Sequence, residues 1–252
     1  MKKPQHILIT GASSGLGAAL ALEYASPALR LSLHGRNTER LEQIAAQARK
    51  QGAEVFTYIG DIVEAGTLSA WIKSCDKETA IDLVIANAGI SAGTAKGAES
   101  AEQVKAIFDT NVTGTFNTLH PIISIMSKRK HGQIAIVSSL AGFRGLPGAP
   151  AYCASKAAVR VYGEGLRSEL ARYNVQVNVI CPGFIKTPMT DANPFSMPFL
   201  MSAERAAKII RKGLSNNQAR IAFPWIMYAG VNFLMMMPQI LIDLIATRTP
   251  RK

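Results

Sequence analysis

Short, mostly apolar runs alternate along the chain with longer stretches in which apolar residues recur at helical spacing. The short runs have the length and composition of buried strands. They cover His6–Thr10, Leu29–His34, Val55–Ile59, Ile81–Ala86, Ile134–Val137, Val175–Ile180 and Arg220–Phe223. The longer stretches predict helices at Leu16–Ala25, Thr38–Lys50, Gly66–Cys75, Ala101–Lys128, Ala151–Tyr173 and Ala203–Leu214. Pro121 lies inside the longest helix, where we expect a bend.

This alternation predicts an α/β fold. Strands that are joined through helices run parallel, and the helices then cover both faces of the sheet. We therefore expect a doubly wound parallel sheet of about seven strands. The chain has no internal repeat, low-complexity segment or linker, so residues 1–252 are expected to form one domain. In such sheets ligands bind at the carboxyl ends of the strands.

Composition narrows the classes of function. The net charge is +11, but the basic residues are dispersed, and no nucleic-acid-binding motif accompanies them. The four His residues have no ligand spacing, so we expect no metal site. Three Cys are too few and too scattered for a disulfide framework, and no secretory signal precedes the first strand. We expect a cytoplasmic protein.

A glycine-rich turn joins the first strand to the first helix. Thr10–Gly17 reads TGASSGLG, and its small residues allow the backbone to approach a pyrophosphate at the helix N-terminus. This position makes the expected fold a Rossmann-type dinucleotide-binding domain. The residues that we expect to contact the cofactor here are Gly11, Ser13, Ser14, Gly15, Leu16 and Gly17.

The end of the second strand bears on the choice between NAD(H) and NADP(H). Gly35 occupies the position where an acidic residue usually binds the ribose of NAD, and Arg36 and Asn37 follow it. An Arg there can bind the 2′-phosphate of NADP through bidentate hydrogen bonds. We therefore expect NADP(H) in preference to NAD(H). The ends of the third and fourth strands add further expected cofactor contacts: Asp61, Ile62, Asn87, Ala88 and Gly89.

Tyr152 and Lys156 are the candidate chemistry. Their spacing of four places both side chains on one face of a helix. A nearby ammonium favours the phenolate and should lower the pKa of Tyr152 toward neutrality. Ser139 follows the fifth strand and could hold a carbonyl oxygen together with Tyr152.

The order of these motifs resembles that of the short-chain dehydrogenases/reductases of about 250 residues. The matching stretches are TGASSGLG, NAG at Asn87–Gly89, Asn111, SSLAG at Ser138–Gly142, YCASK at Tyr152–Lys156 and PGFIKT at Pro182–Thr187. The resemblance implies that Tyr152 is the general acid or base, that Lys156 binds the nicotinamide ribose, and that Ser139 stabilises the oxyanion. It also implies a water-holding relay residue at Asn111 and nicotinamide contacts from Pro182, Gly183, Ile185 and Thr187.

Two later segments bear on the substrate and the surroundings. Residues 188–201 are rich in Pro, Met and Phe, and the family resemblance makes them a substrate lid; Met189, Phe195, Met197, Phe199 and Met201 would line it or pack onto the core. Residues 221–246 form an apolar tail with Asp243 as the single charged residue. Pro224 and Pro238 divide the tail, which favours two short helices over a membrane span. These helices could form a subunit interface, a pocket wall or a peripheral membrane contact.

The sequence therefore predicts an oxidoreductase that transfers a hydride between NADP(H) and a lipophilic carbonyl compound or secondary alcohol. A 3-oxoacyl-carrier-protein reductase is the nearest alternative within the same class. A non-catalytic protein that senses NADP(H) is the alternative from another class, but such proteins usually lose the Tyr or the Lys. We expect a homodimer or homotetramer.

Overall fold

The sheet has seven parallel strands. The computed structural model of the chain describes residues 3–91, 99–191, 196–238 and 240. In this part the strand order is β3-β2-β1-β4-β5-β6-β7, and every pairing is parallel. The strands are β1 (His6–Thr10), β2 (Arg30–Gly35), β3 (Glu54–Ile59), β4 (Leu83–Ala86), β5 (Gly132–Val137), β6 (Val175–Pro182) and β7 (Arg220–Phe223). The chain order reverses between β1 and β4, which is where doubly wound sheets bind their ligands.

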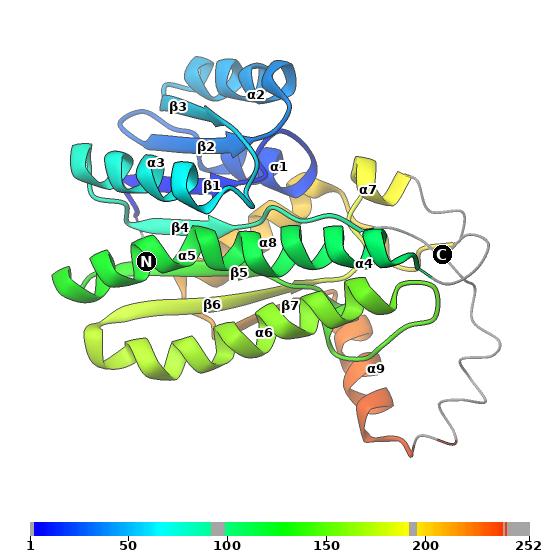
Figure 1. Cartoon of the computed structure of the whole chain (residues 1–252). Helices are drawn as coiled ribbons and strands as arrows, with labels where there is room; N and C mark the ends of the chain where they lie inside the picture. The colour runs from blue at the N-terminus through cyan, green and yellow to red at the C-terminus, as the bar shows by residue number, and fades with distance from the viewer. Residues whose placement is uncertain (1–2, 92–98, 192–195, 239, 241–252) are drawn as a thin grey trace.

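Helices cover both faces of this sheet (Figure 1). One face packs against α1 (Gly15–Tyr24), α2 (Thr38–Lys50) and α8 (Ala203–Ser215). The other packs against α3 (Ala65–Glu78), α5 (Gly114–Arg129) and α6 (Pro150–Leu170). Alternate residues of β1 separate the two cores, since Ile7 and Ile9 belong to the first and Leu8 to the second. The remaining helices of eight residues or more are α4 (Ala101–Phe108) and α9 (Trp225–Met236).

The predicted strands and helices are confirmed, with one difference in the long fourth helical stretch. It is not a single bent helix, because a π-helical turn at Asp109–Thr113 separates α4 from α5. Pro121 lies inside α5, so the irregular turn falls at Asn111 and not at the proline. Such turns insert an extra residue into a helix and recur at functional sites.

The apolar tail forms one helix in the described residues, α9, and most of the second predicted helix lies outside them. Among the described residues, no helix is both long and apolar enough to cross a membrane.

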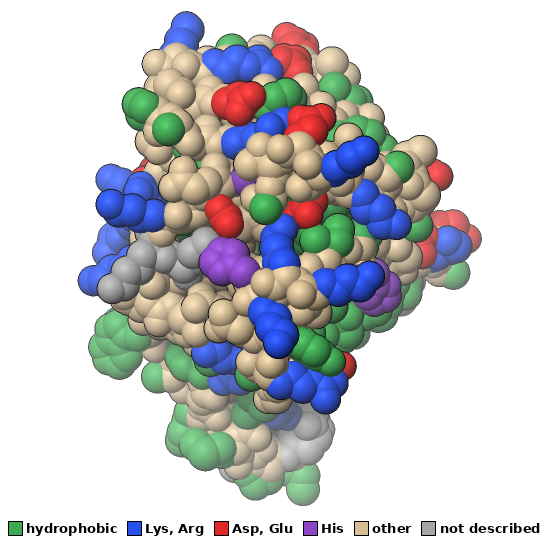
Figure 2. Space-filling model, turned by 90° about the vertical axis from the view of Figure 1, so that its left-hand side faces the viewer, with side chains coloured by type: hydrophobic (Ala, Val, Ile, Leu, Met, Phe, Trp, Pro, Cys, Tyr) green, Lys and Arg blue, Asp and Glu red, His purple; other side chains and the backbone are tan. Residues whose placement is uncertain are grey.

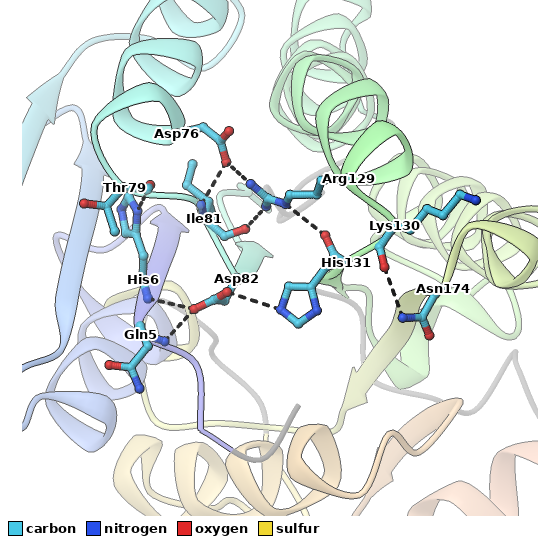
Figure 3. A network of polar contacts seen from close by, with 10 residues as sticks. All are labelled: Gln5, His6, Asp76, Thr79, Ile81, Asp82, Arg129, Lys130, His131 and Asn174. Carbon is cyan, nitrogen blue, oxygen red and sulfur yellow. Dashed lines mark hydrogen bonds and ion pairs between the residues drawn. The ribbon is translucent and has the colours of Figure 1, made fainter.

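The amino ends of the strands are joined by a polar network (Figure 3). The Asp82 carboxylate accepts the backbone N–H of His6 at 3.2 Å and lies 3.5 Å from the His131 ring. Arg129 pairs with Asp76 at 2.7 Å and donates to the His131 carbonyl oxygen at 3.0 Å. Figure 2 shows this side of the molecule, where Lys and Arg side chains are dispersed among acidic ones. The network therefore connects the loops that lead into β1, β4 and β5.

Candidate active site

A cavity of about 370 Å³ lies at the carboxyl ends of the strands and contains most of the predicted site. Its volume is in the range of small-molecule and cofactor sites. The predicted residues that line it are Gly11, Ser13, Ser14, Gly15, Leu16, Arg36, Asn37, Ile62, Asn87, Ala88, Gly89, Ser139, Tyr152, Lys156, Pro182, Gly183, Ile185 and Thr187. Gly17, Asp61 and Asn111 are not part of the lining. The cavity also includes residues that were not predicted as contacts, among them His34, Arg40, Ile90 and Thr110.

The glycine turn leaves the N-terminus of α1 open to the cavity. Gly11 and Gly15 have φ values of 68° and 55°, which favour glycine. A Cβ on Gly11 would lie 2.7 Å from the Ala88 Cα, so the turn and the end of β4 are in close contact. Ser14 precedes the helix but makes no side-chain capping bond to it. The exposed backbone N–H groups of α1 can therefore bind an anion such as a pyrophosphate.

Asn87 fixes this turn. Its Nδ2 donates to the carbonyl oxygens of Thr10 and Gly11 at 3.0 and 3.1 Å. The Thr10 hydroxyl in turn accepts the backbone N–H of Asn87 at 3.1 Å. Gly17 acts in the same way from α1, because a Cβ there would lie 2.1 Å from the Gly11 carbonyl oxygen. Asn87 thus shapes the turn from within the cavity lining, and Gly17 does so from outside it.

A basic corner lies at the end of β2. Arg36 and Asp61 are exposed and form an ion pair of 3.8 Å. Asn37 caps α2 by accepting the backbone N–H of Arg40 at 2.8 Å. Arg40 lines the cavity beside Arg36, and the sequence reasoning missed it. The sequence does contain a signal for Arg40: helix N-termini favour acidic residues, so an Arg in the first turn of α2 is unusual and could have indicated an anion-binding role.

Ser139, Tyr152 and Lys156 meet in the same cavity, from the end of β5 and from α6. The Ser139 hydroxyl accepts the Ala141 N–H at 3.1 Å and donates to the Pro182 carbonyl oxygen at 3.4 Å. The Lys156 Nζ donates to the Val137 carbonyl oxygen at 3.0 Å and lies 5.9 Å from the centre of the Tyr152 ring. These hydrogen bonds thus hold the end of β5, the loop that follows it and the first turns of α6 together beside the cavity.

Burial is the largest influence on the pKa of Tyr152 and on that of Lys156. It raises the pKa of Tyr152, whereas the hydrogen bond with Ser139 acts in the opposite direction. Burial also lowers the pKa of Lys156, to about 8. Surroundings of low polarity disfavour the charged form of each group, which raises the pKa of an acid and lowers that of a base. The pKa of Tyr152 therefore differs from the expectation that Lys156 would lower it.

Asn111 connects two segments behind the cavity. It is fully buried in the π-helical turn, and its Oδ1 accepts the Ile90 N–H at 2.8 Å. Its Nδ2 donates to the Ile90 carbonyl oxygen and to the Ser155 Oγ, each at 2.9 Å. The side chain therefore joins the loop after β4 to α6, three residues beyond Tyr152. Sequence reasoning named Asn111 but did not give it this structural role.

The predicted lid is partly described. Met189, in the short helix α7 (Pro188–Asp191), lines the cavity and is 38% exposed. Phe199 is 53% exposed, whereas Met201 packs against the core and pairs with Ile185 through an isolated β-bridge. Phe195 lies outside the described residues. The segment thus divides between core packing and the rim of the cavity.

The fold and the cavity define a dinucleotide-binding oxidoreductase domain. The family model described as short chain dehydrogenase matches residues 5–195. A relative from Myxococcus xanthus, named "Uncharacterized oxidoreductase", is 40% identical over 242 residues, which cover 96% of each chain. The chain belongs to the short-chain dehydrogenase/reductase family.

Further comparisons agree with this assignment. A 3-oxoacyl-[acyl-carrier-protein] reductase from Synechocystis sp. is 33% identical over 74% of this chain and 76% of its own. Among solved structures, a short-chain type dehydrogenase/reductase from Mycobacterium marinum has a TM-score of 0.77 at 25% identity, covering 86% of this chain and 92% of that one. A short-chain dehydrogenase from Sphingobium yanoikuyae, solved in complex with NADPH, has the same fold, with a TM-score of 0.80 at 24% identity and coverage of 93% and 96%.

Proposed function

We propose that the protein is an NADP(H)-dependent reductase of lipophilic carbonyl compounds, or a dehydrogenase of the corresponding secondary alcohols. The observation that carries this proposal is the presence of the glycine turn and of Ser139, Tyr152 and Lys156 in one cavity of about 370 Å³. One bound ligand could therefore contact both the anion-binding turn and the side chains that transfer protons.

The residues present fit a dinucleotide. Small residues line the cavity where a pyrophosphate would lie against the N-terminus of α1. A Cβ on Gly89 would lie 3.2 Å from the Lys156 Nζ and 3.1 Å from the Asn111 Oδ1, so glycine keeps the backbone close to both groups. Pro182, Gly183, Ile185 and Thr187 also line the cavity and would contact the nicotinamide.

The preference for NADP(H) rests on the corner at the end of β2. Arg36 and Arg40 both line the cavity where no acidic side chain occupies position 35. Two guanidinium groups suit a 2′-phosphate, whose charge they balance and whose oxygens accept their N–H groups. An NAD-specific site would instead have a carboxylate for the ribose hydroxyls.

The roles of the catalytic residues follow from their surroundings. Bound NADPH supplies the hydride. Tyr152 donates the proton to the substrate oxygen during reduction, and the raised pKa keeps its phenol protonated until then. The Ser139 hydroxyl can rotate from its 3.4 Å bond with Pro182 to hydrogen-bond the same oxygen.

Lys156 is held ready to bind the cofactor ribose. An ammonium has three donor hydrogens, and the Val137 carbonyl oxygen accepts one of them. Asn111 is proposed as the relay residue through its main-chain carbonyl, since its side chain is occupied by Ile90 and Ser155. That carbonyl accepts the Thr115 hydroxyl at 2.7 Å, and the relay water would donate a hydrogen bond to the same oxygen.

Reduction of 3-oxoacyl thioesters carried by a protein is the second candidate. It is favoured by the relative from Synechocystis sp. named for that reaction, which is 33% identical to this chain. The exposed Met189, which lines the cavity, suits a lipophilic substrate of either kind. We also propose a cytoplasmic homodimer or homotetramer, whose subunit number light scattering would measure.

The test is oxidation of NADPH with a panel of ketosteroids, long-chain ketones, aldehydes and 3-oxoacyl thioesters. NADH and the Tyr152→Phe variant serve as controls. We expect turnover with NADPH that the variant lacks. Binding of NADPH without turnover of any carbonyl compound would favour the sensor over the enzyme. Faster turnover with NADH would contradict the assignment of Arg36 and Arg40.

A further inference from the structure

Exposed apolar side chains gather on the C-terminal helix. Six of the large hydrophobic side chains that are exposed in the described part of the chain lie between residues 225 and 240: Trp225, Ile226, Phe233, Met235, Met236 and Ile240. Trp225 and Met236 are 74% and 77% exposed. In Figure 1, α9 extends away from the sheet below α6, and Figure 2 shows hydrophobic side chains at the same lower end. Contiguous exposed apolar surface of this kind marks an interaction site.

The two sides of α9 differ. Met227, Tyr228 and Val231 pack against the loop that follows β5 and against β6 and β7. Trp225, Ala229, Phe233 and Met236 recur at spacings of four, four and three, so they form one stripe on the side away from that packing. Ile240, beyond the end of the helix at Met236, is also 75% exposed. The exposed stripe is thus a continuous apolar surface.

This surface has few polar groups. The helix Trp225–Met236 contains no charged residue. Three of its side chains can hydrogen-bond, and two are engaged within the protein: Tyr228 accepts from Arg220 at 2.8 Å, and Asn232 donates to the Tyr228 carbonyl oxygen at 2.7 Å. The third, the exposed Trp225 indole, has a single N–H donor. Protein–protein interfaces usually combine an apolar centre with a hydrogen-bonded polar rim. A single helix of 12 residues, about 18 Å long, provides little of the area that a stable subunit contact needs.

The chain as a whole is positively charged. Its net charge is +11, and from residue 220 onward the sequence contains four basic residues against Asp243 alone, of which Arg220 pairs with Glu164. Arg144 lies at the helix, where it donates to the Leu234 carbonyl oxygen at 3.2 Å. An apolar helix face on a protein of net positive charge suits an anionic lipid surface. Trp225 at one end is typical of the region between headgroups and acyl chains.

We propose that α9 docks the protein on an anionic lipid bilayer, with the stripe Trp225, Ala229, Phe233 and Met236 inserted among the lipids. The packed side of the helix contacts the candidate active site, since the Met227 Sδ lies 3.0 Å from where a Cβ on Gly183 would be. Leu146 and Phe199 expose further apolar surface. A lipophilic substrate could therefore pass from the bilayer to the cavity. This consequence rests on the proposed function, whereas the docking itself does not depend on it.

The test measures binding to vesicles without any turnover. Wild-type protein is sedimented with vesicles of phosphatidylcholine containing about one third phosphatidylglycerol, with pure phosphatidylcholine vesicles, and with no lipid. The variant Trp225→Glu/Phe233→Glu removes the stripe. The control Phe56→Glu/Ile59→Glu places the same two charges at partly exposed apolar positions on the edge strand β3. We expect wild type and the control to bind the anionic vesicles at least tenfold more tightly than the double variant does.

A fluorescence measurement keeps the proposal testable if the double variant does not fold. The chain has two Trp residues, so Trp71→Phe leaves Trp225 as the only indole. Brominated lipid in the anionic vesicles should quench its emission, because the indole enters the acyl region. Equal sedimentation with and without lipid, or unquenched emission, would overturn the proposal. The proposal would also be overturned if wild type did not bind vesicles and the double variant were a monomer while wild type was an oligomer. That result would make the stripe an interface between two copies of the chain. NADPH turnover, measured separately, reports on the proposed enzyme alone.

Discussion

Lys156 donates a hydrogen bond of 3.0 Å from its Nζ to the Val137 carbonyl oxygen, so a side chain of α6 is attached to the last residue of β5. The lysine is almost fully buried and keeps a positive charge at neutral pH, with a pKa lowered to about 8. Burying a charge costs free energy unless partners compensate it. The fold therefore retains this ammonium at the expense of its own stability.

Replacing Lys156 by Met should stabilise the protein and abolish its activity. The charged form is disfavoured by burial, so we expect the free energy of unfolding at pH 7 to rise by about 1–3 kcal/mol. We expect turnover to fall by about 10²–10⁴-fold, since the ammonium takes part in cofactor binding and proton transfer. Urea unfolding and NADPH oxidation measure the two effects.

The pH dependence of stability separates this effect from a change in packing. Above about pH 8 the folded state releases the Lys156 proton, whereas the unfolded chain keeps it up to about pH 10.5. Wild type should therefore gain stability relative to Lys156→Met between these pH values, since every other titrating group is common to the two proteins. The matched control is Lys208→Met on the exposed side of α8, which should change neither stability nor turnover. A Met variant that is less stable than wild type would contradict the prediction.

Removing both Arg36 and Arg40 should weaken NADPH selectively. Hydrogen bonds to a charged group contribute about 1.5–3 kcal/mol each, so Arg36→Ala/Arg40→Ala, which removes at least two, should raise the KM for NADPH by about 10²- to 10⁴-fold. The KM for NADH should stay within about threefold, because NADH lacks the 2′-phosphate. Arg49→Ala, at the far end of α2, serves as the control. Equal losses with both cofactors would assign the two Arg residues a structural role.

Asn111 should matter to folding as much as to catalysis. Asn111→Ala leaves the N–H and carbonyl of Ile90 and the Ser155 hydroxyl without this partner, which should cost about 2–4 kcal/mol of stability. Ser155→Ala removes one of these bonds and should cost about 1 kcal/mol. A double-mutant cycle measured by urea unfolding should show coupling between the two positions. Additive losses would indicate that the bond between them contributes little.

Two buried histidines should make the protein less stable in mild acid. Burial lowers the pKa of both His6 and His34 below 6.5. The unfolded chain therefore takes up protons at a pH where the folded chain does not, so stability is complete above about pH 6.5 and falls as the pH drops below it. The free energy of unfolding from pH 7.5 to 5.0 should decline by up to about 1.4 kcal/mol per pH unit for each histidine.

His34→Gln tests this assignment. The His34 Nε2 lies 3.1 Å from the Gly60 carbonyl oxygen, and Gln can donate the same hydrogen bond without titrating. The variant should show a shallower decline in stability between pH 6.5 and 5.0. His120→Gln, at an exposed position on α5, should leave the slope unchanged. An unaltered slope in His34→Gln would show that His34 is not the group that takes up the proton.

Much of the fold could be predicted because each strand is a short apolar run that ends at a motif. The glycine turn after His6–Thr10 and the motifs that follow Leu83–Ala86 and Gly132–Val137 all reach the cavity as expected. What could not be predicted depends on contacts between distant segments. The π-helical turn at Asn111 follows from bonds to Ile90 and Ser155, which no local pattern encodes. Burial, which sets the pKa of Tyr152 and Lys156, is likewise a property of the assembled fold.

The closeness of Gly35 to Ser13 constrains how the cofactor preference could change during evolution or design. A Cβ at position 35 would lie 3.0 Å from the Ser13 Cβ and 3.1 Å from its hydroxyl oxygen. The acidic side chain that an NAD-specific site needs at the end of β2 therefore requires the Ser13 side chain to shift by a few tenths of an ångström. A change from the proposed NADP(H) preference to NAD(H) is easier when positions 13 and 35 change together, and the two residues would then act as one heritable unit of specificity.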